Sequence, residues 1–298
     1  MNVSTMKASV KKELWEFSGM LTWVPVALAG IFIFIPLLIM LLNGVNMNTI
    51  LEVFKHLSET QYGDEVEKVF FVSTIALFVP FVLVGFIVQL YYFVTCLYDE
   101  RRDQSVMFWR SLPVSDTVTI ASKALTGAVV IPAIFYSAAT VLFFIGLVLA
   151  FAACVILSIG FDITLWGLWS STNMISVLAS IWLTLLPTAI WLLPLYAWLM
   201  LMSIYAKKAP FLWAVLPIVV LLIIEGIVVH YLHLSQPFFG HFIGDYFSIV
   251  SENDTSFENA SIFAPVLAVL AKIDYRTIIV SAALLFATYW FRVNKQES

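Results

Sequence analysis

The sequence predicts an all-α integral membrane protein: a six-transmembrane-helix bundle with an N-terminal amphipathic interface helix and with both termini in the cytoplasm. The composition, the length of the apolar blocks and the placement of the basic residues predict this class. Of the 298 residues, 62% are hydrophobic and 11% are charged, whereas a soluble domain carries about a quarter charged residues. The apolar residues form blocks of about twenty or more, the length that a helix needs to cross a hydrocarbon core of about 30 Å.

The first expected element is an amphipathic helix ahead of the first apolar block. Val10, Leu14 and Phe17 recur at helical spacing, with charged residues between them, which is typical of a helix that lies in the membrane interface. A simple continuation of the first span is the alternative. The apolar block that follows lacks a small-residue cleavage site before the next polar stretch, so we interpret it as a retained span and not as a secretory signal.

Six apolar blocks then follow one another, within a single transmembrane domain of residues 1–298. The third block is longer than one crossing requires, and Pro132 within it predicts a kink or an extension beyond the bilayer. The fourth contains Pro187 and Pro194, which neighbouring helices can accommodate inside a bundle. We place the spans at residues 21–42, 69–97, 124–158, 178–206, 211–232 and 275–291.

The basic residues set the orientation of the spans. Eleven of the fifteen lysines and arginines lie before the first span, between the second and third, between the fourth and fifth, or after the last. By the positive-inside rule, both termini and the loop of residues 98–123 are therefore cytoplasmic, and residues 233–274 are external. The loops are too short to form an independent catalytic domain, so we expect the function to reside in or beside the membrane.

Residues 98–127 read YDERRDQSVMFWRSLPVSDTVTIASKALTG and mix charges with large apolar side chains. A solvated loop has little use for Phe108 and Trp109, whereas a short helix that docks into a groove on a partner needs such apolar anchors beside orienting charges. Anchoring of the same aromatic residues at the membrane surface is the alternative. The glycine-rich loop G-x-x-x-x-G-K-[ST] that cradles ATP phosphates is absent from the sequence, so any ATPase that drives this protein must be a separate chain.

This pattern resembles the permease subunits of type 2 ABC exporters. The resemblance lies in the run DERRDQS, the step SLPVS at residues 111–115, the segment SKALTG with Lys123 opening the third span, and the amphipathic KKELWEFSGMLTWVP. It implies a multi-pass protein of a bacterial inner membrane whose translocation path is formed with a second copy or a related permease. A dimer of ABC ATP-binding subunits would be the partner and would hold ATP and Mg. The chain itself would then be no enzyme and would hold no cofactor or metal, with the lipid bilayer and not nucleic acid as its other partner.

The resemblance also implies roles for individual residues. In this family the loop between the second and third spans carries a coupling helix that sits in a cleft of the ATPase. The expected docking surface comprises Glu100, Arg102, Phe108, Trp109 and Leu112. The family's long external segment, often with short helices that partly re-enter the membrane, would correspond to residues 233–274, and a plain surface loop is the alternative there.

Glu225 lies inside the fifth expected span, where a carboxylate is costly unless it is paired or hydrated. It either lines a translocation path or is protonated or hydrogen-bonded within the bundle, and both interpretations stay open. His230 and His233 follow on one helical face, which invites a metal site or an intramembrane enzyme that uses these three residues. That hypothesis is weak, because the motif H-E-x-x-H is absent from the sequence. A non-transport scaffold or sensor subunit is the further alternative.

Overall fold

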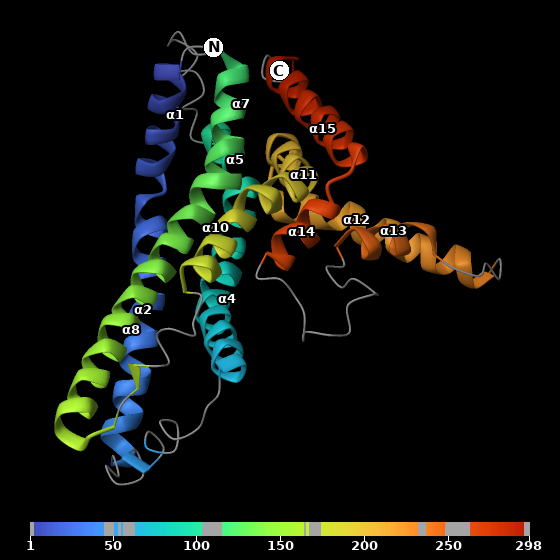
Figure 1. Cartoon of the computed structure of the whole chain (residues 1–298). Helices are drawn as coiled ribbons and strands as arrows, with labels where there is room; N and C mark the ends of the chain where they lie inside the picture. Colours follow the sequence, from blue (N-terminus) through green and yellow to red (C-terminus); the bar gives the residue numbers. More distant parts are fainter. Residues whose placement is uncertain are drawn as a thin grey trace. The chain divides into compact units, whose positions relative to one another are not determined.

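Every regular element in the described part of this computed structural model is a helix (Figure 1). The structure describes residues 3–44, 51–52, 55, 63–102, 115–163, 165–166, 174–231, 237–247 and 263–294. The helices are α1 (Val3–Glu16), α2 (Ser18–Asn43), α4 (Gly63–Thr95), α5 (Tyr98–Arg102), α7 (Asp116–Leu125), the π-helical turn η1 (Thr126–Val130), α8 (Ile131–Phe161), α10 (Met174–Trp191), α11 (Leu193–Tyr205), α12 (Pro210–Tyr231), α13 (Phe238–Phe247), α14 (Ala264–Ala271) and α15 (Tyr275–Asn294).

Six helices within the described residues are long and apolar enough to cross a membrane. They cover Ser18–Leu42, Phe70–Arg102, Asp116–Phe161, Met174–Trp191, Pro210–Tyr231 and Tyr275–Asn294. Large apolar side chains on α2 and α12 are exposed over much of both helices, an arrangement that lipid tails stabilise and water does not. The expected class, an all-α membrane protein with six apolar spanning helices, is confirmed.

The fourth apolar block differs from the single span expected at 178–206, because it is divided into α10 and α11 at Leu192. The division follows from Pro194, which occupies the first turn of α11. Proline has no N–H to donate to the preceding turn and its ring crowds that turn, so a new helix begins there more easily than the old one continues. Pro187, by contrast, lies within α10 without ending it.

The third apolar block is one long helical run, Asp116–Phe161, as its length indicated. Directly before Pro132 the run widens into η1, where the N–H of Ile131 donates to the carbonyl of Thr126 five residues back. The missing N–H of Pro132 removes one α-helical bond at this point, which favours a wider turn. The side-chain amide of Gln89 donates to the Gly127 carbonyl in this turn at 2.9 Å.

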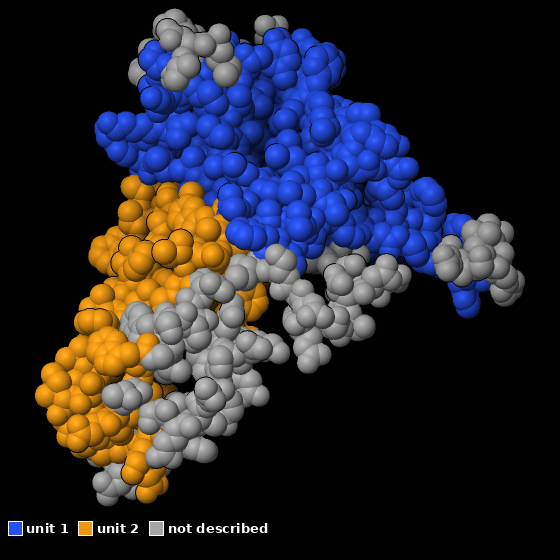
Figure 2. Space-filling view, viewed as in Figure 1, with its two compact units in different colours: residues 1–16, 87–131, 183–298 blue, residues 17–86, 132–182 orange. Residues whose placement is uncertain are grey.

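The chain divides into two compact units (Figure 2). The first comprises residues 1–16, 87–131 and 183–298, and the second comprises residues 17–86 and 132–182. In the first unit, Phe93 stacks on Tyr196 with ring centroids 4.5 Å apart. A Cβ atom at Gly127 would lie 2.3 Å from the Phe93 ring, so the close approach of α4 and η1 requires glycine there. In the second unit, Phe81 and Phe135 are fully buried.

Candidate functional site

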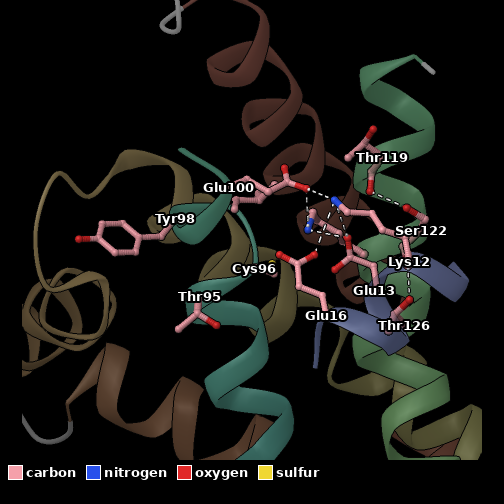
Figure 3. A network of polar contacts seen from close by, with 12 residues as sticks. Lys12, Glu13, Glu16, Thr95, Cys96, Tyr98, Glu100, Thr119, Ser122 and Thr126 are labelled. Atoms are coloured by element: carbon pink, nitrogen blue, oxygen red, sulfur yellow. Dashed lines mark hydrogen bonds and ion pairs between the residues drawn. The ribbon is translucent and has the colours of Figure 1, made fainter. Parts of the chain in front are cut away.

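A cluster of charged side chains, four of them fully buried, lies in the first unit near the ends of five helices. Its acidic members are Glu13, Glu16, Glu100 and Asp116, its basic members are Lys12, Lys123 and Arg292, and the Tyr92 hydroxyl joins them. We call this set the ionic cluster. It draws on α1, on α4 and α5, on α7 and on α15, which are far apart in sequence. Figure 3 shows Lys12, Glu13, Glu16 and Glu100 converging on one another.

Local helix geometry places these side chains. Ser115 is the N-cap of α7 and accepts a hydrogen bond from the Val118 N–H, which fixes Asp116 in the first turn of that helix. Glu100 lies in the first turn of α5, and Arg292 lies in the last turn of α15. A carboxylate at a helix N-terminus and a cation at a C-terminus both lie favourably in the field of the helix dipole.

Lys123 is the centre of the ionic cluster. Its ammonium lies 2.8 Å from Glu13 Oε1 and 3.1 Å from Glu100 Oε1, so it joins α1 to α5. The second oxygen of Glu13 accepts a hydrogen bond from Tyr92 Oη at 2.9 Å. Lys12 approaches Glu100 Oε1 to 3.1 Å from the more exposed side. One lysine of α7 therefore holds the N-terminal helix against the end of the second apolar helix.

Arg292 forms the other half of the ionic cluster. Its Nη1 lies 3.3 Å from Glu100 Oε2, and its Nε donates to Asp116 Oδ1 at 2.7 Å. Glu100 precedes residues 103–114 and Asp116 follows them. The guanidinium of α15 therefore links two residues, Glu100 and Asp116, of the predicted docking loop of residues 98–123.

Burial makes the ionic cluster costly to disturb. The side chains of Glu13, Glu100, Lys123 and Arg292 are each at most 3% exposed, and they comprise two carboxylates and two cations. Charges withdrawn from water are stable only when they are paired and hydrogen-bonded, and removing one partner typically costs about 3–5 kcal/mol. The balanced charge of these four groups meets that requirement.

Glu16 lies at the edge of the ionic cluster, 3.7 Å from Lys12 and half-buried. Desolvation by burial raises the pKa of the Glu16 carboxyl above its ordinary value, and the like charge of Glu13 adds to the increase while Lys12 opposes it.

A second junction lies beside the ionic cluster, where α5 meets the end of α11. The Ser203 hydroxyl accepts hydrogen bonds from the N–H groups of Leu97 and Tyr98, at 3.2 and 3.0 Å. The Arg101 guanidinium donates to the carbonyls of Ile204 and Ala206, which would otherwise lack partners at the C-terminus of α11. Residues 206–209, which join α11 to α12, thus begin next to α5, the helix that precedes residues 103–114 in the sequence.

The sequence-predicted docking residues divide into three groups. Glu100 is buried in the ionic cluster and directs its carboxylate toward Lys123 and Arg292. Arg102 has a side chain that is 61% exposed and lies 3.6 Å from Asp99. Phe108, Trp109 and Leu112 lie outside the described residues.

Glu225 has backbone partners in the structure. Its carboxylate accepts hydrogen bonds from the N–H groups of Phe239 and Gly240, and so satisfies two of the free donors at the N-terminus of α13. This matches the hydrogen-bonded alternative, and the role of Glu225 in a translocation path stays a prediction. Residues 233–274 contain the helices α13 and α14.

The histidines of the rival hypothesis are only partly described. His230 is exposed at the end of α12, and His233 lies outside the described residues. Farther along the chain, His241 pairs instead with Asp245 at 2.7 Å. In the described part of the chain, no group of three or more histidine, cysteine or acidic side chains is arranged to hold a metal ion.

The sequence analysis missed the cooperation of Glu13, Tyr92, Asp116 and Arg292. One signal pointed toward it, because each of these residues lies within eight residues of the edge of an apolar block on the same predicted side of the membrane. Sequence spacing could not show which of them pair. Comparison of this chain with protein-family models, with curated proteins and with solved structures finds no match.

Proposed function

We propose that this chain is the membrane-spanning permease subunit of an ATP-driven type 2 ABC exporter in a bacterial inner membrane, with both termini in the cytoplasm. Two copies, or one copy and a related permease, form the translocation path. A dimer of separate ABC ATP-binding subunits binds ATP and Mg and docks on residues 103–114 and 206–209. The observation that carries this proposal is the ionic cluster, which binds both ends of residues 103–114 to the first and last helices of the chain.

A coupling loop needs rigid ends, because a force applied to a loop with compliant ends is absorbed locally. Glu100, at one end, pairs with Lys123, which also binds α1, and with Arg292 of α15. Asp116, at the other end, pairs with the same arginine. Separating these groups would leave buried charges unpaired, at a cost of about 3–5 kcal/mol for each lost partner. We therefore expect α1, α5, α7 and the end of α15 to move together when the loop is displaced.

The second junction supports the same assignment. Arg101 and Ser203 tie the start of residues 103–114 to the end of α11, where residues 206–209 begin. One partner surface can therefore contact both segments. The exposed pair Lys207 and Lys208 would give that contact a positive charge, and the positive-inside rule assigns the same pair to the cytoplasm.

The proposed cycle consists of movement in this chain and ATP hydrolysis in the partner. Closure of the ATPase dimer on ATP draws the docked loops of the two permeases together. Since the loop ends are held in the ionic cluster, the displacement passes to α1 and α15 and shifts the bundle between inward-facing and outward-facing states. The partner's affinity must differ between these two states for ATP to drive the change.

Affinity purification of the tagged full-length chain from its native membrane in a mild detergent tests this proposal. We expect an ABC-type ATP-binding subunit to co-purify at a fixed ratio and to hydrolyse ATP. Changing Phe108→Ser together with Trp109→Ser should abolish the association while the permease stays folded.

The matched control is Phe238→Ser with Phe242→Ser, two exposed phenylalanines of α13 on the opposite predicted side. This variant should retain the ATPase. The proposal is wrong if the chain purifies intact and alone in several detergents, or if an all-polar segment 103–114 leaves its associations and activity unchanged, as a scaffold or sensor subunit would allow.

A further inference from the structure

We infer that the outer face of α1 is a binding surface for anionic phospholipid headgroups, formed by Lys7, Lys11 and Trp15. The inference needs only that the chain lies in a membrane, and it is independent of the proposed transport function. It starts from the orientation of α1, which the ionic cluster fixes.

The ionic cluster determines which face of α1 points outward. Glu13 is 2% exposed and binds Lys123 and Tyr92, so its side of α1 faces the rest of the first unit. Each residue turns an α-helix by about 100°, so Lys7, Lys11 and Trp15 lie within an arc of about 80°, and Glu13 lies about 160° from Lys11. The exposures agree: both lysines are exposed, and Trp15 is 70% exposed.

The chemistry of this face matches an anionic headgroup layer. Lys11 Nζ lies 5.0 Å from the centre of the Trp15 ring, which brings a cation and an interfacial aromatic side chain to one spot. Among the described residues, no acidic side chain forms an ion pair with Lys7 or Lys11. The half-buried acid on this helix, Glu16, is paired with Lys12 at 3.7 Å. The face therefore presents uncompensated positive charge.

The position of α1 along the chain brings this face to the required depth. Trp15 precedes Ser18, the first residue of the first candidate span, by three residues. Three residues reach at most about 10 Å even when fully extended, so the indole lies near the level at which that span enters the bilayer. Tryptophan is enriched at this level because its ring is apolar and its N–H is polar. Lys11 and Lys7 precede Trp15 on α1 by about one and two helical turns.

Quenching of tryptophan fluorescence by brominated lipids tests the inference on the full-length protein reconstituted in nanodiscs. The chain has ten tryptophans, so the difference between the parent and Trp15→Phe isolates the Trp15 signal. The nanodiscs contain phosphatidylcholine and phosphatidylglycerol in a constant ratio, and either one lipid or the other carries bromine. We expect Trp15 to be quenched more by the brominated anionic lipid, and increased salt should reduce this preference.

The two lysines should supply the preference for anionic lipid, and each should enrich that lipid locally by roughly fivefold at moderate salt. The double change Lys7→Gln and Lys11→Gln should therefore remove it, whereas Lys207→Gln with Lys208→Gln, an exposed pair elsewhere, should leave it intact. Equal quenching by both lipids in the parent would overturn the inference. So would a preference that survives the loss of Lys7 and Lys11, or a Trp15 that no lipid quenches because another surface covers it.

Discussion

Replacement of Lys123 by methionine is the most demanding test of the ionic cluster, because this lysine contacts two carboxylates at once. Its side chain is 1% exposed, and methionine approximates its volume without its charge. After the change, Glu13 keeps the Tyr92 hydroxyl and a more distant Lys12 at 3.8 Å, but loses its 2.8 Å partner. Glu100 keeps Lys12 and Arg292.

The expected loss is about 3–5 kcal/mol of unfolding free energy, the typical cost of leaving a buried charge without its partner. Unfolding in mixed micelles of increasing denaturing-detergent fraction, followed by tryptophan fluorescence, measures it. Adding Glu13→Gln to Lys123→Met removes the carboxylate that has lost its closest partner and should restore about 1–3 kcal/mol, because residues of one network do not act additively. The exposed Lys208→Met is the control and should change stability by less than about 0.5 kcal/mol. If Lys123→Met behaves like Lys208→Met, the ionic cluster does not hold these helices together.

Three further predictions follow from the same contacts. Gly127→Ala should destabilise the first unit by about 1–3 kcal/mol in the same assay, because the added methyl group would overlap the Phe93 ring. Gly146→Ala, inside a helix with open space around it, should cost no stability. Glu225→Ala should speed hydrogen exchange of the amides at the start of α13, because their hydrogen-bond acceptor is lost. It should leave the ATP hydrolysis of a purified complex unchanged. Loss of a chemical activity of the chain alone would favour an intramembrane enzyme instead. Glu16→Gln should flatten the pH dependence of the unfolding free energy. A carboxyl whose pKa is raised in the folded state binds more protons there than in the unfolded state, so the stability of the parent falls as pH rises from the ordinary glutamate range toward neutrality. A fall of equal size in the variant would contradict this cause.

The class of the protein follows from its sequence because the physics of a bilayer is simple. Spans such as Pro210–Tyr231 must satisfy their backbone within the helix and present apolar side chains, and both demands can be seen in a single segment. The points at which one helix ends and the next begins were harder to predict. Pro187 and Pro194 look equivalent in the sequence, yet only Pro194 falls where a new helix starts.

The ionic cluster could not be predicted, because its pairs are separated by up to 192 positions along the chain, as for Glu100 and Arg292. Patterns of charge along the sequence assign Lys123 and Arg292 to the same side of the membrane but do not say that they share a carboxylate. The expectation that Glu100 belongs to a docking surface came from a family resemblance alone. In the structure Glu100 is buried between Lys123 and Arg292.

Site-specific photocrosslinking in the native membrane tests the central claim most directly. A photoreactive amino acid replaces Trp109 in the full-length chain, and a second variant carries it in place of Phe238 on the exposed face of α13. After illumination, the covalent adducts are purified under denaturing conditions and identified. We predict that position 109 captures an ABC-type ATP-binding subunit and that position 238 does not. Adducts at position 109 that contain lipid but no ATPase, or an ATPase captured equally at both positions, would contradict the account.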